Sequence, residues 1–577
     1  MYSHVYFPKE IKSVTIKIMK KYFPLLLIFF LGAVLRFAFL GTVPVGFHRD
    51  EAYLGYNAYS ILKTGRDISG NFLPIHLQSY LYSPAGYSYF AIPFVWAFGL
   101  SAFSVRFASA FFGSCTILLI YFTVRDLFFR FTKGERFKKN AKNIALFSAG
   151  FLAISPWHIN LSRTTTENTL VTFFTVLGFL LFLRYLKKWN WLFLFLSFLS
   201  FFITLFIYQA PRAFLPLFIP FLVLMFWNKI SGLRKIIIFI LYAIVIIVPV
   251  FVILQSPALS TRVRTLNIFE HPQTKIMIND WVLTDGVTKI PYVLTRIFHN
   301  KITGYVLTFS ENLANHFSYG FLFADKGFPD RYRIPSTGLL YPFEIFLIFL
   351  AVIRLFSTES SIGILLIGWI IISFSGTALS FDDIPNLQRT LMAVPAFSVL
   401  SGFGLYELSE LFKSNKIHRI GLICMSVVIL YSVGFYVVQY YSYGKNYRSW
   451  YRQDGYKKLV DKVNSNIGGY KKAVITSREE SPTIFFLFFS VYDPQRFQNE
   501  TKDANMFVSD SVNFSMYEFT KEQCPVRIDT ITKQLTGRPD ILYVNSSLCG
   551  EAPKGARLLD ELYRTDGSKV FQILKVE

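Results

Sequence analysis

The sequence predicts a multi-pass membrane protein, with an all-α transmembrane domain followed by a small C-terminal α/β domain. Of the 577 residues, 53% are hydrophobic, 18% are aromatic and only 16% are charged, which is too apolar for an ordinary soluble domain. Apolar runs near the ~20 residues needed to cross a bilayer recur along the first 440 residues. Beyond residue 440 the content of charge, Asn, Ser and Gly rises, which indicates a separate domain.

The net charge of +23 indicates how the chain crosses the membrane. In a soluble protein this charge would suggest nucleic acid as a partner, but here the basic residues lie in short loops between apolar runs, as in cytoplasmic loops. No nucleic acid partner is expected. The Lys-rich residues 1–21 are predicted to be cytoplasmic. The first apolar run is too long for a signal peptide and lacks a small-residue cleavage site, so we expect an uncleaved span.

The basic loop 125–142 is also expected to be cytoplasmic, which restricts the crossings before it. If both apolar runs between the first span and this loop crossed, the loop would be outside. The first of them, AGYSYFAIPFVWAFGLS, is short, Pro-interrupted and Tyr-rich, so we predict an interfacial helix within an outer loop, residues 41–102. The remaining runs give about eleven spans with the C-terminus outside. They are expected at 22–40, 103–124, 142–162, 168–186, 190–209, 213–227, 235–254, 340–356, 360–379, 391–411 and 419–440, with a second outer loop at 255–338.

Residues 441–577 are predicted to form the small extracytoplasmic α/β domain. KAVITS, TIFFLFF and DILYVN are expected to be strands, and GYKKLVDKVNS and GARLLDELYR are expected to be helices. Cys524 and Cys549 both fall here, where an oxidising compartment permits a disulfide, and the sequence leaves the paired and unpaired states open. Cys115 and Cys424 fall in spans and are expected to be packing residues.

This topology gathers acidic and basic side chains at the outer membrane face. Ionisable groups are costly at membrane depth, so their convergence marks a candidate functional site. Arginine binds phosphate through two N–H groups, and a carboxylate can accept a proton from an attacking hydroxyl. Together these groups suit the transfer of a substituent from a phosphate to a nucleophile. The residues are His48, Arg49, Asp50, Glu51, Arg163, Glu167, Tyr208, Gln209, Arg212, Asp382, Asp383 and Arg389.

Each of these groups also has a purely structural interpretation. Asp50 would suit a helix N-cap, with Glu51 favoured in the first turn by the helix dipole. Arg163 and Glu167 are spaced i, i+4 and would suit a salt bridge. His48 would suit a structural position at the membrane interface, and Arg212 and Arg389 would suit contact with lipid headgroups. Asp382 and Asp383 would suit a solvated loop. No pair of His or Cys has metal-ligand spacing, so no structural zinc is expected, although a carboxylate pair would suit weak binding of Mg²⁺ or Mn²⁺.

The order of the motifs resembles the GT-C superfamily of polyprenyl-phosphate-dependent glycosyltransferases. DEAYLGYNAYSILKTGRD follows a single first span, as in that superfamily. PWHINLSRTTTENTL looks like the second outer loop of the branch that includes protein O-mannosyltransferases and lipid A aminoarabinose transferases. IPNLQRTLMAVPAF resembles a later Pro- and Arg-containing segment of the same branch. The resemblance covers about residues 20–440 and implies a GT-C-type transmembrane catalytic domain over 22–440.

The resemblance implies roles for individual residues. Asp50 matches the first-loop acidic residue taken as catalytic base or as the group that orients the acceptor, and Glu51 is its partner. Glu167 corresponds to the second-loop acidic residue. Arg163 and Arg389 match positions expected to face the lipid phosphate.

One departure from the family pattern concerns the segment before the interfacial helix. Many relatives have Lys-Pro-Pro there, but this chain has LYSPAGY, with Ser83 at the place expected for Lys. Arg212 is expected to compensate. The wall of the substrate cavity is predicted to contain His48, Tyr53, Tyr56, Asn57, Tyr208 and Gln209.

These residues predict an inverting glycosyltransferase that acts at the extracytoplasmic face. A sugar on a polyprenyl phosphate would bind with its phosphate among Arg163, Arg212 and Arg389. An acceptor hydroxyl or amine on a protein, lipid or glycan would attack the anomeric carbon while Asp50 removes its proton. The expected partners are this donor, the acceptor and membrane lipids.

Other classes of protein fit the same sequence less well. A transporter or lipid flippase of envelope biogenesis should show polar, broken spans and paired halves, which the sequence lacks. A scaffold in envelope assembly would not require acids and arginines at one face. Within the enzyme class, an oligosaccharyltransferase should carry a WWD-type motif, from which RSWYRQDGY differs.

Overall fold

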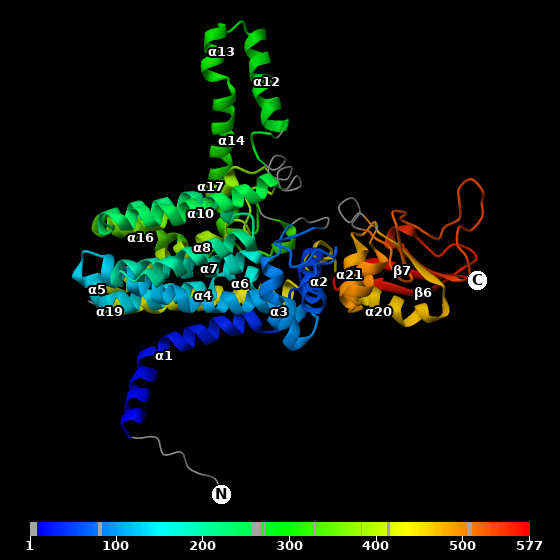
Figure 1. The fold of residues 1–577 in the computed structure, drawn as a ribbon, viewed down its shortest axis with the longest axis horizontal. Coiled ribbons are helices and arrows are strands. Elements are labelled where there is room, and N and C mark those ends of the chain that lie inside the picture. Colours follow the sequence, from blue (N-terminus) through cyan, green and yellow to red (C-terminus); the bar gives the residue numbers. More distant parts are fainter. Residues whose placement is uncertain are drawn as a thin grey trace.

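The computed structural model describes residues 9–78, 83–255, 267–270, 272–327, 329–381, 383–411, 416–502, 504 and 511–577. The candidate residue Asp382 lies outside these ranges. The described chain forms a bundle of long helices with a smaller, sheet-containing domain at one end (Figure 1). This arrangement confirms the prediction of a mostly helical protein with a small C-terminal sheet domain.

The bundle has an apolar outer surface as well as an apolar core. On α10 (Leu233–Gln255), Phe239 is 67% exposed and Ile247 is 62% exposed, and such a surface is expected to face lipid rather than water. The other bundle helices are α1 (Lys9–Phe37), α4 (Ala102–Phe131), α5 (Glu135–Ile154), α6 (Pro156–Ser162), α7 (Glu167–Lys188), α8 (Trp191–Ile207), α9 (Pro211–Met225), α16 (Glu344–Thr358), α17 (Ser360–Ala378), α18 (Val394–Leu411) and α19 (Lys416–Val438).

Six of the described helical segments are long and apolar enough to cross a membrane. They are α4, α7, α10, α17, α18 with the 3₁₀ turn η3 (Leu391–Ala393) before it, and α19 with the turn that follows it. The pair α5–α6 makes a seventh, bent by 54° where Pro156 begins the second helix, since proline cannot continue the hydrogen-bonding pattern of the first. A multi-pass protein is thus confirmed, whereas the predicted count of about eleven spans is not confirmed.

The end of the bundle next to the C-terminal domain carries short elements that are not among the helices long and apolar enough to cross a membrane. We call it the outer end, because the sequence predicts it to be extracytoplasmic. The short elements are α2 (Arg49–Thr64), the strand pair β1 (His76–Leu77) and β2 (Ser83–Pro84), and α3 (Gly86–Phe98). The 13 residues of α3 extend about 20 Å. The bilayer core is roughly 30 Å thick, so α3 has the length of an interfacial helix. The Tyr87 hydroxyl donates to the Val105 carbonyl (2.9 Å), which fixes α3 against α4.

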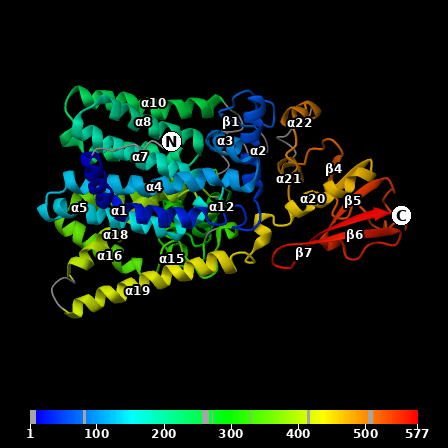
Figure 2. The ribbon, with the colours of Figure 1, turned by 90° about the horizontal axis from the view of Figure 1, so that it is seen from below.

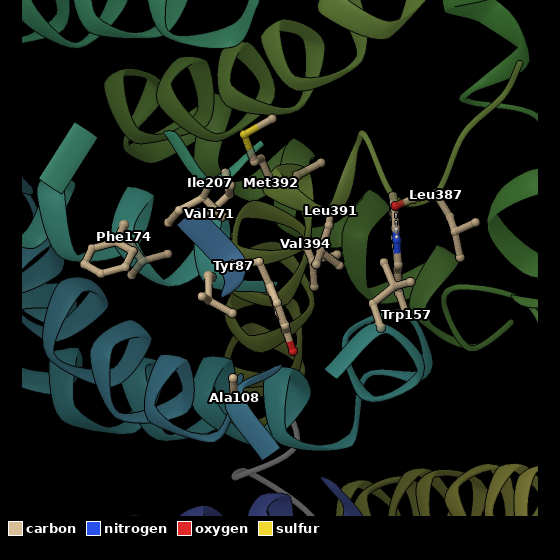
Figure 3. Close-up of a cluster of buried hydrophobic side chains, with 14 of the residues drawn as sticks. Tyr87, Ala108, Trp157, Val171, Phe174, Ile207, Leu387, Leu391, Met392 and Val394 are labelled. Atoms are coloured by element: carbon tan, nitrogen blue, oxygen red, sulfur yellow. Dashed lines mark hydrogen bonds between the residues drawn. The ribbon is translucent and has the colours of Figure 1, made fainter. Parts of the chain in front are cut away.

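A buried cluster connects the helices below this outer end (Figure 3). Trp157 in α6 donates from its indole N–H to the carbonyl of Leu387 (2.8 Å), so the second outer motif is joined to the IPNLQRT segment. Leu391, Met392 and Val394 pack in the same cluster. The two motifs, which are more than 200 residues apart in the sequence, therefore form one packed unit.

The described residues between 267 and 332 form a helical hairpin and the turns that follow it. The hairpin consists of α12 (Pro272–Val287), α13 (Tyr292–Phe298) and α14 (Lys301–Asn315), and it projects sideways from the bundle (Figure 1). The chain returns through α15 (Tyr319–Phe323) and the 3₁₀ turn η2 (Asp330–Tyr332) to the outer end of the bundle.

In the described part of the C-terminal domain, a five-stranded mixed sheet is accompanied by three α-helices. The strand order is β4 (Tyr517–Thr520), β3 (Lys472–Thr476), β5 (Ile541–Ser546), β7 (Lys569–Val576) and β6 (Ala556–Tyr563). β3 is parallel to β4 and β5, whereas β7 is antiparallel to β5 and β6. The helices are α20 (Tyr456–Asn466), α21 (Pro482–Phe489) and α22 (Pro494–Glu500), and Cys524 and Cys549 form a disulfide.

Two predictions within this domain are wrong. TIFFLFF belongs to helix α21, not to a strand, because the helix is buried on all sides and a uniformly apolar run carries no period that separates the two structures. GARLLDELYR belongs to strand β6, not to a helix. Register irregularities near Leu558 and Leu562 interrupt the strict alternation of a strand, which made the segment resemble an amphipathic helix. The predicted strands KAVITS and DILYVN and the helix GYKKLVDKVNS are present.

The C-terminal domain packs against α2 at the outer end of the bundle (Figure 2). The Tyr56 hydroxyl donates to the carbonyl of Tyr492 (2.8 Å), and Arg49 pairs with Glu480 (2.8 Å). At Gly55 a Cβ would come within 2.9 Å of the Phe488 ring, so glycine permits this close approach. The domain therefore holds α2 in place from the aqueous side.

Candidate active site

A cavity of about 490 Å³ lies at the outer end of the bundle. Its wall combines α2, the start of α7, the start of α9, η2 and the IPNLQRT segment. The residues that line it include His48, Asp50, Glu51, Tyr53, Ser83, Thr165, Glu167, Tyr208, Gln209, Arg212, Arg331, Tyr332, Asp383, Asn386, Gln388, Arg389, Met392 and Arg452. Most of the predicted site residues thus meet in one space, although they come from distant parts of the sequence.

Asp50 lies in the first turn of α2 but does not cap the helix. His48 is the N-cap, and its Nδ1 accepts from the backbone N–H of Asp50 (3.2 Å), while Glu51 accepts from the backbone N–H of His48 (3.4 Å). The Asp50 carboxylate is left to face the cavity, with its side chain 37% exposed. The structural interpretation of Asp50 as the N-cap is therefore wrong.

The surroundings of Asp50 favour its ionised form. Burial acts to raise the pKa of this carboxyl, but His48, Arg331 and Arg49 outweigh burial and hold the pKa below its ordinary value. Asp50 is therefore a carboxylate at neutral pH, the form that a general base requires.

Glu51 lines the cavity, but its carboxylate is engaged in a buried ion pair. Its carboxylate accepts from Nε and a terminal N–H of Arg106 (2.8 and 3.0 Å) and from the backbone N–H and hydroxyl of Thr165 (both 3.1 Å). Burial acts to raise the pKa of Glu51, but Arg106 outweighs it and the net shift is downward. Arg106 also donates to the carbonyls of Pro44 (3.0 Å) and Gly46 (2.8 Å). Glu51 thus joins α2 to α4 and to the chain that precedes α2.

Glu167 begins α7 at the cavity wall. It is 8% exposed, and one carboxylate oxygen accepts from the side-chain amide of Gln388 (3.2 Å). Gln388 in turn accepts from the hydroxyl of Tyr332 (3.1 Å). This chain of contacts connects the second outer motif, the IPNLQRT segment and η2 around the cavity.

Four arginines line the cavity: Arg212, Arg331, Arg389 and Arg452. Arg212 contacts His76 Nε2 (2.7 Å), and Arg389 donates to the hydroxyl of Ser380 (3.0 Å). The buried Nε atoms of Arg212 and Arg331 make no hydrogen bond to the residues that the structure describes. Buried donors are costly when unsatisfied, and these two line the cavity, so they are available to an anionic ligand that binds there.

Arg163 does not line this cavity, although it was predicted to face the phosphate. It is fully buried, and its terminal N–H groups donate to the carbonyls of Leu35, Arg36, Ala38 and Val43 at 2.5 to 3.0 Å. Its guanidinium also lies 4.8 Å from the ring centroid of Tyr441. These contacts satisfy the carbonyls at the end of α1 and leave no terminal N–H for phosphate or for a salt bridge to Glu167.

Two predicted cavity residues also lie outside the cavity wall. Tyr56 contacts the C-terminal domain, and Asn57 accepts from the backbone N–H of Ile68 (2.9 Å) and donates to the carbonyl of Tyr53 (2.9 Å). Position 56 is turned away from the face of α2 that carries Asp50. Position 57 shares that face but lies two turns further along the helix, where the contacts with Tyr53 and Ile68 take up its side-chain amide. The other four predicted wall residues, His48, Tyr53, Tyr208 and Gln209, line the cavity.

A second cavity, of about 1060 Å³, lies between the bundle and the C-terminal domain. We refer to it as the vestibule. It shares four residues with the first cavity, namely His48, Asp50, Arg331 and Asp383. The opposite wall comes from the C-terminal domain and includes Trp450, Tyr451, Arg478, Glu479 and Glu480. Asp50 therefore lies where the two cavities meet.

The sequence analysis missed Arg106, Arg331, Tyr332 and Arg452. Arg331 and Tyr332 belong to DRYRIP, a charged and aromatic run within a long outer loop, and that composition was a usable signal. Arg452 belongs to RSWYRQDGY, which was compared only with a tryptophan motif. Arg106 lies inside an apolar span, where an unpaired charge is disfavoured, so a partner such as Glu51 should have been expected.

Among the residues that the structure describes, no three His, Cys, Asp or Glu side chains are placed to hold a metal ion. The suggested Mg²⁺ or Mn²⁺ stays a prediction, because Asp382 lies outside the described chain.

Comparisons with known proteins give a family match and a fold match. Residues 26–262 match the model of the dolichyl-phosphate-mannose-protein mannosyltransferase family. No curated protein sequence matches the chain. ArnT from Cupriavidus metallidurans, in a crystal structure bound to undecaprenyl phosphate, aligns with a TM-score of 0.52 and 11% identity over 95% of this chain and 97% of ArnT.

A second solved structure is the oligosaccharyltransferase AglB from Archaeoglobus fulgidus, in complex with an inhibitory peptide and a dolichol-phosphate. It aligns with a TM-score of 0.49 and 14% identity over 82% of this chain. The chain spans 64% of the length of AglB.

The chain has a fold similar to that of ArnT over nearly its whole length. Residues 26–262 resemble the dolichyl-phosphate-mannose-protein mannosyltransferases. This region contains Asp50, Glu51, Glu167 and Arg212. The resemblance predicted from the motifs is confirmed.

Proposed function

We propose that the protein is an integral-membrane glycosyltransferase that moves a sugar from a polyprenyl-phosphate donor to an acceptor at the extracytoplasmic face. The observation that carries the proposal is the meeting of an ionised carboxylate, Asp50, with four arginines in one cavity at the outer end of the bundle. A base and a set of cations in one cavity suit transfer from a phosphate leaving group.

The donor phosphate binds among Arg212, Arg331, Arg389 and Arg452. Guanidinium groups hold phosphate through charge-assisted hydrogen bonds, and the unsatisfied Nε atoms of Arg212 and Arg331 supply donors for it. The undecaprenyl phosphate bound to ArnT, which has the same fold, supports a lipid phosphate as the ligand. Ser83 also lines the cavity, with a buried hydroxyl that has no partner among the described residues, and it supplies a neutral donor where relatives have Lys.

The chemical step is a single displacement at the anomeric carbon. The acceptor oxygen or nitrogen bonds to that carbon while the bond from carbon to the phosphate oxygen breaks, and the electron pair leaves with the phosphate. Asp50 accepts the proton of the acceptor, and the arginines stabilise the charge that develops on the departing phosphate. Attack opposite the leaving group inverts the configuration of the sugar.

Glu51 acts as a positioning residue rather than as a second base. All the contacts of its carboxylate are structural, and they hold the first turn of α2 against α4. The orientation of Asp50 depends on that turn, because the two residues are adjacent in it. Glu167 has the same kind of role through Gln388 and Tyr332.

The acceptor reaches Asp50 from the vestibule. The donor cavity and the vestibule meet at His48, Asp50, Arg331 and Asp383, so two substrates can approach the base from different sides. Part of the vestibule wall belongs to the C-terminal domain, which gives that domain a part in acceptor binding.

A transfer assay tests the proposal. The full chain in lipid nanodiscs is incubated with a radiolabelled polyprenyl-phosphate sugar and extracts of candidate acceptors, and the products are identified by mass spectrometry. We expect release of polyprenyl phosphate and an inverted glycoside with the natural chain, and neither with Asp50→Asn. Glu135→Gln is the matched control, because Glu135 is 85% exposed in the predicted cytoplasmic loop. Movement of the intact donor across the bilayer without cleavage would indicate a flippase instead.

A further inference from the structure

The hairpin α12–α14 has no place in the proposed reaction, yet it is firmly rooted beside the donor cavity. The side-chain amide of Asn312 in α14 donates to the carbonyls of Ala378 (3.0 Å) and Ser380 (3.2 Å) at the outer end of α17. Asn267, just before α12, lines the donor cavity and pairs with Ser380 as a β-bridge.

The two arms of the hairpin form one stable unit. Ile278 of α12 packs against Gly304 of α14, where a Cβ would come within 2.5 Å of it. His299 Nδ1 lies 2.7 Å from the Asp285 carboxylate, and the His299 ring lies 5.4 Å from the ring of Trp281. These contacts use the inner faces of the arms, so the outer faces are not required to hold the hairpin together.

The outer faces are strongly apolar. The most exposed side chains include Leu283 (67%), Val287 (83%), Ile297 (56%) and Ile302 (76%). On α14, apolar residues recur at 302, 306 and 309, the spacing of one face of a helix. An apolar surface of this extent on a projecting element indicates a contact with an apolar phase or with a partner.

The direction of the hairpin indicates that its apolar surface contacts the membrane. It runs across the long axis of the bundle near the outer end and extends past the edge of the bundle (Figure 1), and it is seen nearly end-on in Figure 2. Because the bundle axis crosses the bilayer, the hairpin runs along the membrane plane. The exposed apolar surface of α10 faces lipid, and the hairpin is rooted near the outer end of that same bundle.

We propose that the hairpin 272–315 lies on the outer leaflet and inserts its apolar faces at the boundary between headgroups and acyl chains. Helices of this kind insert to a depth of about 5–10 Å. Tyr292 is exposed and belongs to a residue type favoured at that depth, and Lys289 and Arg296 near the tip suit contact with lipid phosphates. Since its root adjoins Asn267 and Ser380, the hairpin also fixes the height of the donor cavity at the headgroup level.

Depth-dependent fluorescence quenching tests this proposal and does not depend on the proposed transferase activity. The full chain, with Cys115 and Cys424 changed to serine, carries a single bimane label at Val287→Cys, at Ile240→Cys or at Ile531→Cys. Ile240 is 52% exposed midway along α10 and serves as the deep control, and Ile531 is 89% exposed in the C-terminal domain and serves as the aqueous control. The proteins are reconstituted with lipids that carry a nitroxide either near the headgroup or near the middle of the acyl chain.

We expect the label at Val287 to be quenched more by the shallow nitroxide than by the deep one, and the label at Ile240 to show the reverse order. The label at Ile531 should be quenched by neither and should remain open to aqueous iodide. Quenching at Val287 no greater than at Ile531 would overturn the proposal. Protection of Val287 from both the nitroxides and iodide would overturn it as well, because a second copy of the chain would then cover the hairpin.

Discussion

The adjacent carboxylates Asp50 and Glu51 should respond in opposite ways to the same isosteric change. Asp50→Asn removes the proposed base, and general bases contribute about 10²–10⁴-fold to the rate, or roughly 3–5 kcal/mol of the activation barrier. The cost in folding stability should be small, since the Asp50 side chain is 37% exposed and forms no buried ion pair. Surface charges of this kind contribute about 0–1 kcal/mol.

Glu51→Gln should instead destabilise the fold. The pair between Glu51 (4% exposed) and Arg106 (fully buried) loses its charge balance, and a buried arginine is left without its carboxylate. Removal of one partner from a buried pair costs about 3–5 kcal/mol. A second change, Arg106→Gln, should recover much of this loss because it removes the uncompensated charge.

The two effects are separated by measuring thermal unfolding and sugar transfer on the same purified samples. Asp50→Asn should unfold near the temperature of the natural chain and be inactive. Glu51→Gln should unfold at a clearly lower temperature and keep some turnover at low temperature. If Asp50→Asn kept full turnover, or if Glu51→Gln unfolded like the natural chain, the assignment of base and positioning residue would be refuted.

Three further predictions concern the phosphate site, the pH profile and the domain contact. Arg331→Gln should raise the KM for the donor by at least about tenfold, since a charge-assisted hydrogen bond contributes roughly 1.5–3 kcal/mol. An unchanged KM in this variant would contradict the role of Arg331 in phosphate binding. Arg163→Gln should instead lower the unfolding temperature. The low pKa of Asp50 keeps the base ionised as the pH falls. The acidic limb of the pH profile of kcat/KM should therefore lie below about pH 4. An acidic limb near pH 6 that shifts in Asp50→Glu would contradict this prediction. Gly55→Ala should loosen the C-terminal domain by about 1–3 kcal/mol through overpacking, measured by proteolysis, whereas Gly150→Ala, with no atom within 4 Å of the new Cβ, should not.

Patterns of composition and period predicted the coarse features correctly. The apolar runs gave the membrane bundle, and the change in composition near residue 440 marked the start of the sheet domain, because burial in lipid or in a core requires those residue types. Segments whose pattern is ambiguous were assigned wrongly. α21 is apolar all round, and β6 contains irregularities that shift its alternation, so neither shows its own period.

Which charged residues line the cavity and which stabilise the fold could not be predicted in the same way. Arg163 and Arg331 are both arginines near outer motifs. The terminal N–H groups of Arg163 are taken by the carbonyls at the end of α1, whereas Arg331 lines the cavity. The role of each arginine depends on which hydrogen-bond acceptors lie within its reach after folding. Sequence spacing carries no information on which acceptors those are.

The sequence by itself determined that this chain enters a bilayer and that a carboxylate at position 50 follows the first apolar run. It predicted that the acidic and basic motifs gather at the outer face. Hydrophobic runs and the sidedness of basic loops are local properties, so they can be read from the chain. Only the tertiary structure decided that Glu51 is bound to Arg106, that Arg452 comes from beyond the bundle to join the cavity, and that the C-terminal domain holds α2. Those outcomes depend on distances between residues that are as many as 436 positions apart in the chain, as Tyr56 and Tyr492 are.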